Sequence, residues 1–135
     1  MTVLIDYERA KAKEVFLILE KKKLLKQGDR VLDIGCSTGV LLNVAKSFNL
    51  DAVGLDVPAE GDWFDQFSSK EQRFIHDFQQ DETDSIGKFD IVIMQEVVEH
   101  LKRPYDFFEN LKSILKKTSI IYLTTPNLSG VVFKN

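Results

Sequence analysis

Hydrophobic residues alternate between two patterns along most of the chain. Short apolar runs, rich in Val, Ile and Leu, read RVLDI (30–34), DAVGLD (51–56), RFIHD (73–77), FDIVIMQ (89–95) and SIIYLTT (119–125). Between several of them lie segments with helical spacing of apolar positions, such as GVLLNVAKSF (39–48) and PYDFFENLKSILKK (104–117). Continuous apolar strands separated by amphipathic helices are typical of a parallel sheet covered on both faces. The pattern therefore predicts an α/β fold, Rossmann-like and doubly wound, with a mainly parallel sheet.

The segment that precedes these strands predicts a helix over residues 6–26. Asp6 is a candidate N-cap, and apolar side chains at Val15, Ile18 and Leu19 recur at helical spacing. Gly28 suits the end of that helix. We therefore expect one domain over residues 1–135, with an N-terminal helix in 1–28 and an α/β core in 29–130.

The helix predicted from residue 104 has the clearest boundaries. Pro104 suits a first helical turn, and Lys116 and Lys117 are placed to complement the dipole at its C-terminal end. The segment FQQDETDSIGK (78–88) has little helical pattern, so we expect a loop with about one turn of helix there.

Composition and charge limit the possible partners. The chain has 135 residues, enough for one hydrophobic core, and its net charge of −3 gives no general attraction for phosphate backbones or anionic lipid. No apolar run is long enough to span a bilayer, and the N-terminus does not resemble a secretion signal. The single Cys36 cannot form an internal disulfide. We expect a cytoplasmic protein that binds neither nucleic acid nor membrane.

Polar and acidic residues end the predicted strands. In an open parallel sheet, ligands bind at the carboxyl ends of the strands, where the strand order reverses. The residues expected to be functional are therefore those at positions 33–39, 56, 77, 95–100 and 124–127.

The first strand runs into the turn DIGCSTG (33–39). Gly35 permits a sharp turn, and Gly39 lets the next helix approach a ligand. A dinucleotide site would read G-x-G-x-x-G, which this turn does not match, and Asp33 would repel a pyrophosphate but favour a cationic ligand. Glycine turns between strand and helix are also common without any ligand. Cys36 is expected to be a small loop residue rather than a nucleophile.

The next two strands also end in aspartates. Asp56 is placed to accept hydrogen bonds from both hydroxyls of a ribose, although it could instead form a turn before Pro58. Asp77 could accept from an exocyclic amine of adenine, and Phe78 could offer an apolar face to the base. A helix cap followed by a core Phe is the alternative for that pair. Three carboxylates at three successive strand ends favour the functional interpretation.

The segments VLDIGCSTGVLL, VGLDV, HDF, FDIVIMQEVVEHLKRPYDFFENLKSILK and IIYLTTPN together resemble class I S-adenosylmethionine-dependent methyltransferases. They are most similar to the small-molecule branch in which the fourth strand runs into an E-V-x-E-H segment, and the similarity covers about residues 28–130. The resemblance implies a seven-stranded fold, S-adenosylmethionine as cofactor, S-adenosylhomocysteine as product and methyl transfer as the reaction. The cofactor-binding residues that it implies are Asp33, Gly35, Cys36, Gly39, Asp56, Val57, Asp77, Phe78 and Gln95.

The charge of this cofactor agrees with the residues. Adenosylmethionine carries a sulfonium, an ammonium and a carboxylate, so a crevice lined by carboxylates attracts it. Its leaving group is neutral, so the main tasks of the enzyme are alignment and exclusion of water. His100 is the candidate general base, although we favour local hydrogen bonding for it. Glu96, Glu99 and His100 have helical spacing, but without further His or Cys ligands we expect no metal.

Two features depart from the family pattern. Ser37 occupies the middle position of the glycine motif, and the sequence stops at Asn135, soon after the fifth strand. We therefore expect the last strands of the fold to be absent, and a homodimer or a partner chain to cover the sheet edge. The function expected first is methyl transfer to a small-molecule acceptor. A non-catalytic adenosylmethionine-binding module or a partner-dependent subunit is the alternative, and the spacing of Gly35 and Gly39 opposes an NAD-dependent oxidoreductase.

Overall fold

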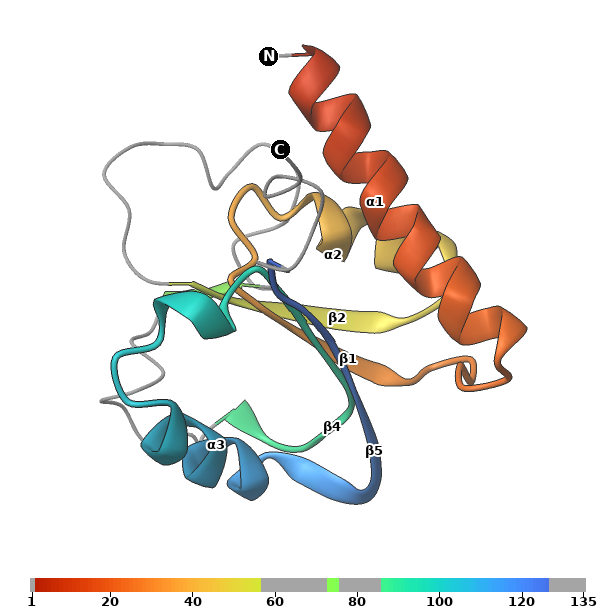
Figure 1. Cartoon of the computed structure of the whole chain (residues 1–135). Helices are drawn as coiled ribbons and strands as arrows, with labels where there is room; N and C mark the ends of the chain where they lie inside the picture. Colours follow the sequence, from red (N-terminus) through yellow and green to blue (C-terminus); the bar gives the residue numbers. More distant parts are fainter. Residues whose placement is uncertain (1, 57–72, 76–85, 127–135) are drawn as a thin grey trace, which may run out of the picture.

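The protein contains one parallel sheet with helices on both faces, as Figure 1 shows. The computed structural model describes residues 2–56, 73–75 and 86–126. Its strands, in chain order, are β1 (Arg30–Ile34), β2 (Asp51–Asp56), β3 (Arg73–Ile75), β4 (Phe89–Gln95) and β5 (Leu115–Thr124). They form a five-stranded sheet in the order β3-β2-β1-β4-β5, and every described neighbouring pair is parallel. The predicted fold class is confirmed.

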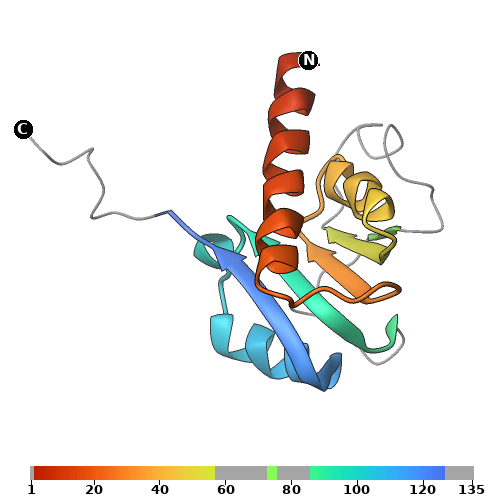
Figure 2. The same ribbon diagram turned by 90° about the vertical axis from the view of Figure 1, so that its right-hand side faces the viewer.

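The helices divide the hydrophobic core into two clusters. Helices α1 (Thr2–Lys21) and α2 (Val40–Ser47) cover one face of the sheet, where Phe16 and Leu42 pack with the strand residues Val31, Ile91 and Ile93. Helix α3 (Pro104–Ser113) covers the other face, and a short 3-10 helix, η4 (Val98–His100), connects β4 to it (Figure 2). The alternation of the strand side chains therefore decides which residues face α1 and which face α3.

Helix α1 differs at both ends from the sequence prediction of 6–26. It begins at Thr2, so Asp6 lies inside the helix and is not its N-cap. It ends at Lys21, and Lys23, two residues further along, adopts a left-handed conformation with φ 58°. The amide of Leu24 donates to the carbonyl of Leu19 at 2.9 Å, which closes the helix in a Schellman motif. Gly28, expected at the helix end, lies in the turn before β1 with φ +80°.

The junction of α3 and β5 also differs from the prediction. The helix ends at Ser113 because the buried Ile114 forms a turn and its carbonyl accepts from the amide of Phe89 at 2.9 Å. Lys116 and Lys117 therefore lie in β5 and do not end the helix, which corrects that expectation. Lys116 Nζ instead pairs with Asp90 Oδ1 at 2.7 Å and ties β5 to β4.

The sheet topology creates a crevice beside the central strands. Strand order reverses between β1 and β4, because β1 continues to β2 on one side while β4 continues to β5 on the other. The connections that follow these two strands leave in different directions at their carboxyl ends, as Figure 1 shows. Within the described part of the chain, no helix is long and apolar enough to cross a bilayer.

Candidate functional site

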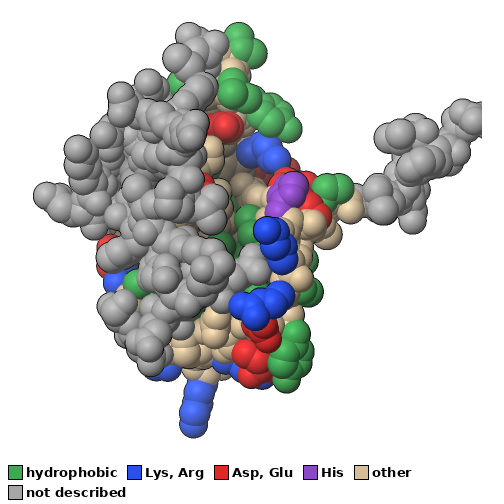
Figure 3. All heavy atoms as spheres, turned by 90° about the vertical axis from the view of Figure 1, so that its left-hand side faces the viewer, with side chains coloured by type: hydrophobic (Ala, Val, Ile, Leu, Met, Phe, Trp, Pro, Cys, Tyr) green, Lys and Arg blue, Asp and Glu red, His purple; other side chains and the backbone are tan. Residues whose placement is uncertain are grey.

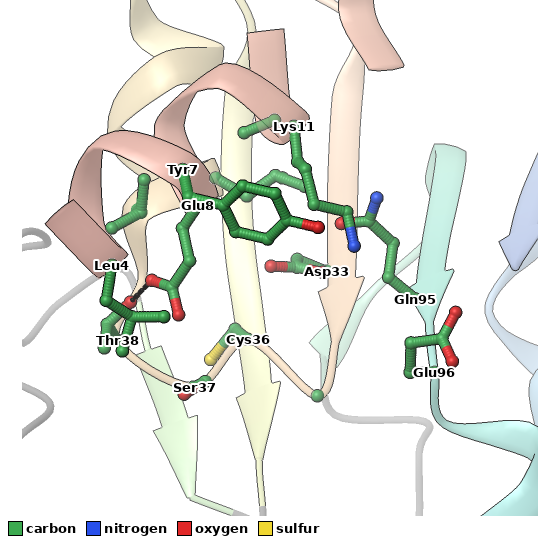
Figure 4. Close-up of a pocket in the computed structure, with 14 residues that line it drawn as sticks. Leu4, Tyr7, Glu8, Lys11, Asp33, Cys36, Ser37, Thr38, Gln95 and Glu96 are labelled. Atoms are coloured by element: carbon green, nitrogen blue, oxygen red, sulfur yellow. Dashed lines mark hydrogen bonds between the residues drawn. The ribbon is translucent and has the colours of Figure 1, made fainter. Parts of the chain in front are cut away.

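A pocket of about 240 Å³ opens at the carboxyl ends of β1 and β4 (Figure 4). Its walls come from the N-terminal half of α1, the turn between β1 and α2, the start of α2 and the end of β4. The lining residues are Leu4, Tyr7, Glu8, Lys11, Ala12, Asp33, Gly35, Cys36, Ser37, Thr38, Val40, Leu41, Gln95 and Glu96. The pocket therefore lies where the strand order places a ligand site.

The turn from β1 into α2 holds a conformation that needs glycine. Gly35 has φ +81°, and a Cβ built there would lie 2.7 Å from Val97 Cγ2 in the connection after β4. Gly39 caps α2 with φ 77°, and Ser37 between them also has a positive φ, of 43°. The amides of Gly35 and Cys36 both donate to the carbonyl of Leu55, at 2.8 and 3.1 Å. The turn is thus fixed against β2 and against the connection that follows β4.

Two aspartates, at the ends of β1 and β2, lie next to the glycine turn. Asp33 is the one charged side chain buried among the described residues, with 5% of its surface exposed. Burial, and then the nearby charge of Asp56, raises the pKa of Asp33 to about 7. Asp56 Oδ2 accepts a hydrogen bond from the backbone amide of Ser37 at 2.6 Å, so this aspartate also fixes the glycine turn. A cationic group in the pocket would favour ionised Asp33.

The end of β4 contributes one wall and a strained residue. Gln95 lines the pocket, and Glu96 beside it has a left-handed φ of 55°. The amide of Glu96 donates to the carbonyl of Thr124 at 3.0 Å, which holds this conformation against β5. Lys23 and Asn49 have similar φ angles in turns that do not line the pocket, so it is the place of Glu96 in the pocket wall that makes it a candidate.

The candidate base lies apart from the pocket. The His100 side chain is 79% exposed, does not line the pocket, and has its Nε2 4.0 Å from Glu99 Oε1. Among the described residues, no three His, Cys, Asp or Glu side chains are grouped so that they could hold a metal ion.

The predicted cofactor-binding residues fall into three sets. Asp33, Gly35, Cys36 and Gln95 all line the pocket. Gly39 and Asp56 do not line it, but the first caps α2 and the second bonds the glycine turn. The remaining three lie outside the described residues, and they are Val57, Asp77 and Phe78.

Helix α1 supplies residues that the sequence analysis missed. Glu8 Oε2 accepts a hydrogen bond from Thr38 Oγ1 at 2.9 Å and so ties the helix to the glycine turn. Lys11 is the one cationic side chain among the lining residues, and its Nζ lies 5.6 Å from the centroid of the Tyr7 ring. The helical spacing of the sequence indicates which face of α1 these residues share, because positions 4, 7, 8 and 11 continue the stripe of the buried residues 12, 15, 16 and 19.

The comparison with a family model covers nearly the whole chain. Residues 5–132 match the model described as "Methyltransferase domain". The "Ubiquinone biosynthesis O-methyltransferase" of Actinobacillus pleuropneumoniae serotype 7 is 26% identical over 132 residues, which cover 91% of this chain and 52% of that protein. The protein of the same name from Glaesserella parasuis is 28% identical over 116 residues, with coverage of 78% and 49%. The chain thus spans about half the length of these curated relatives.

Solved structures give the same fold. The plantazolicin methyltransferase BpumL, in complex with a pentazolic desmethylPZN analog and SAH, superimposes with a TM-score of 0.69 at 20% identity, over 91% of this chain and 48% of that one. A SAM-dependent methyltransferase from Archaeoglobus fulgidus gives a TM-score of 0.66 at 25% identity, with coverage of 87% and 54%. Together with the match of the family model, these similarities establish that the chain belongs to the methyltransferase-domain family.

Proposed function

We propose that the chain is an S-adenosylmethionine-dependent methyltransferase, or the cofactor-binding part of one, that acts on a small-molecule acceptor and forms S-adenosylhomocysteine. The observation that carries this proposal is the buried carboxyl of Asp33 at the floor of the pocket, beside a glycine turn that Asp56 fixes. An anionic group that is desolvated in this way favours a cationic ligand, and the family's cofactor is one.

The methionine end of the cofactor fits the described pocket. Asp33 offers a carboxylate to the ammonium and sulfonium charges, and Lys11 on the facing helix offers a cation to the carboxylate. Gly35, Cys36 and Gln95 supply the surrounding wall. The pocket therefore contains a charge partner of each sign for a ligand end that carries both signs.

The adenosine end is assigned to the strand ends on the other side of the glycine turn. Asp56 is proposed to take the ribose hydroxyls, with Val57 beside it, and Asp77 and Phe78 are proposed to flank adenine. Support comes from Asp56, which lies at the carboxyl end of β2 next to the crevice. Gly39, the N-cap of α2, is proposed to let the first turn of that helix approach the ligand.

Adenosylmethionine, when bound, supplies a methyl group on a cationic sulfur that leaves as a neutral thioether. The residues of this chain therefore need not stabilise a new anion on the leaving group. Their work is to hold the reacting groups in line and to keep water out, for which α1 over the glycine turn is suitably placed. His100 would act as a general base only if the acceptor reached the surface beside it.

A small-molecule acceptor is supported by the relatives and by the charge of the chain. The curated relatives named above are O-methyltransferases of ubiquinone biosynthesis. The net charge of −3 gives the chain no general attraction for nucleic acids.

Ligand-induced stabilisation tests the proposal directly. Adenosylmethionine, adenosylhomocysteine and NAD are added in parallel while thermal unfolding is followed. A ligand at about a hundredfold its dissociation constant should add about 2.7 kcal/mol to the free energy of unfolding. We expect both adenosyl compounds to stabilise the protein and NAD not to. Stabilisation by NAD alone would refute the methyltransferase assignment.

The edge strand β5 is proposed to pair with a further strand. β5 is the last strand in the order of the described sheet, so one of its backbone edges has no partner strand among the described residues. The apolar side chains of Ile121 and Leu123 on the same strand are exposed. A homodimer, a partner chain or further residues of a longer chain could supply the cover. Sedimentation of this chain at high concentration tests the first possibility, since a monomer throughout would exclude the homodimer.

A cytoplasmic location is also proposed, because Cys36, the one cysteine of the chain, is buried and cannot form an internal disulfide. Fractionation of cells that express the protein would place it, and recovery outside the cytoplasm would contradict the proposal.

A further inference from the structure

One face of α1 changes its environment halfway along the helix. Toward the C-terminal end its side chains are buried against the sheet and α2, as Val15 and Leu19 are. The same face continues toward the N-terminus as Leu4 and Tyr7, which line the pocket but remain 56% and 60% exposed. Figure 2 shows this half of the helix standing away from the sheet, and Figure 3 shows hydrophobic side chains gathered at its end.

The pocket consequently has two chemically different parts. Its floor holds the Asp33 carboxyl, and Lys11 faces it from the helix. Its outer wall is the aliphatic side chain of Leu4 and the ring of Tyr7 (Figure 4). A charged methionine end suits the floor, whereas it gains little from an apolar wall. A second molecule with apolar surface would gain free energy by covering that wall.

We propose that Leu4 and Tyr7 bind the acceptor, which is therefore a small molecule with an apolar ring or chain next to the group that receives the methyl. This inference rests on the proposed function, because it places the acceptor beside the cofactor. The hydrogen bond between Glu8 and Thr38 supports it, since that bond holds α1 against the glycine turn and so fixes the apolar wall relative to the floor.

A polar anchor for the same molecule lies at the end of β5. Thr124 is paired in register with Gln95, which lines the pocket. The Thr124 hydroxyl is buried and has no hydrogen-bond partner among the described residues. Such a group is costly until a partner reaches it. Thr124 itself does not line the pocket, so this hydroxyl is proposed as the partner of a polar acceptor group that reaches past Gln95.

Two probes that differ only in apolar area test the inference. Catechol and 4-hexylcatechol are titrated into the protein saturated with S-adenosylhomocysteine, and binding is measured by calorimetry. We expect 4-hexylcatechol to bind at least tenfold more tightly, because each buried methylene adds to the affinity. Leu4→Ser and Tyr7→Ser should each reduce this ratio threefold or more. The affinity for S-adenosylhomocysteine should stay within twofold.

Matched controls carry the same substitutions outside the pocket. Leu17→Ser changes another exposed leucine of α1, and Tyr105→Ser changes an exposed tyrosine of α3. Both should keep the preference for 4-hexylcatechol. Equal binding of the two catechols, or binding of neither, overturns the inference. A loss of S-adenosylhomocysteine affinity in the Leu4 and Tyr7 variants also overturns it and assigns the wall to the cofactor.

Two other outcomes are told apart in the same experiments. Sedimentation with phosphatidylcholine vesicles is also measured for the unmodified protein and the same variants. If the Leu4 and Tyr7 variants lose only this binding, the apolar wall binds lipid and the inference is wrong. If S-adenosylhomocysteine does not bind the unmodified protein, the proposed function fails first, and the acceptor site beside it fails with it.

Discussion

Replacement of Asp33 by Asn tests the electrostatics at the floor of the pocket. The substitution keeps the size of the side chain and removes its charge. Burial and the charge of Asp56 raise the pKa of Asp33 from its ordinary value of 3.8 to about 7. Because one pKa unit corresponds to about 1.4 kcal/mol, ionised Asp33 destabilises the ligand-free fold by up to about 4 kcal/mol. Asn cannot ionise, so the variant avoids this cost.

The sign of the pH dependence follows from the raised pKa. Between about pH 4 and pH 7 the folded protein holds the Asp33 proton more tightly than the unfolded chain does, so stability falls as the pH rises through this window. Below this pH window Asp33 is protonated in both the folded and the unfolded protein. Above the window Asp33 is ionised in both, and the full destabilisation of the folded protein is present. The advantage of Asp33→Asn is therefore small near pH 4 and largest above pH 7.

Urea unfolding at pH 5, 6, 7 and 8 measures this difference. We expect the variant to gain about 2–3 kcal/mol over the unmodified protein between pH 5 and pH 8. Asp6→Asn is the control, because Asp6 is exposed on α1 and does not line the pocket, so the slope should stay unchanged. Parallel curves for the Asp33 variant and the unmodified protein would refute the electrostatic argument.

The same carboxyl links cofactor binding to pH. A cationic ligand favours ionised Asp33, so adenosylmethionine should displace close to one proton at pH 6 and few above pH 8. Calorimetry in buffers with different ionisation enthalpies counts these protons, and the Asp33→Asn variant should release none. A proton count that does not depend on residue 33 would remove Asp33 from the contact with the cofactor.

Three further substitutions test separate features of the site. Gly35→Ala should lower the free energy of unfolding by about 2–4 kcal/mol in urea titrations, because the new Cβ would meet Val97. Gly28 has a similar φ but open space around it, so Gly28→Ala should lower the same free energy by only about 1 kcal/mol. Equal losses in the two variants would contradict the steric argument. Thr124→Val should raise stability by about 1 kcal/mol yet weaken 4-hexylcatechol binding, and loss of stability would show that the hydroxyl already has a partner. Asp56→Ala should weaken adenosylmethionine binding by about 1–3 kcal/mol in calorimetry, and unchanged affinity would exclude it from the site.

The sheet could be predicted because its strands carry their own pattern. β1, β2 and β4 are nearly continuous apolar runs, and the structure gives them the predicted bounds. Their burial on both faces makes the pattern strong and independent of distant contacts. The glycine turn was also readable, because positive φ angles at Gly35 and Gly39 need a residue without a side chain.

Element ends were less predictable because tertiary contacts decide them. The helix before β5 was expected to continue through residues 115–117, whose pattern is compatible with either structure. It stops instead because Ile114 fills a buried position and Phe89 takes its carbonyl. Likewise α1 ends at a left-handed Lys23, a conformation that the sequence of three lysines does not indicate.

The role of α1 in the site could not be read from its spacing alone. An amphipathic stripe predicts which face is covered, but not by what. In α1 the amphipathic stripe extends beyond the part of the helix that packs on the sheet. The N-terminal half of the stripe therefore faces the pocket and not the core. Tyr7 and Lys11 therefore look like ordinary helix residues in the sequence, and only the three-dimensional fold places them opposite Asp33.

The turn after β1 and the connection after β4 approach each other closely at the pocket. The turn after β1 and the connection after β4 leave the sheet in different directions, yet Val97 contacts the position where Gly35 has no side chain. Gly35 is thus required twice, once for its φ and once for space, and Glu96 accepts a strained φ on the facing side. Asp33 lies buried in the pocket that these two connections line. A preorganised site binds a cation more strongly than a flexible one, so disruption of either connection should lower cofactor affinity as well as the free energy of unfolding.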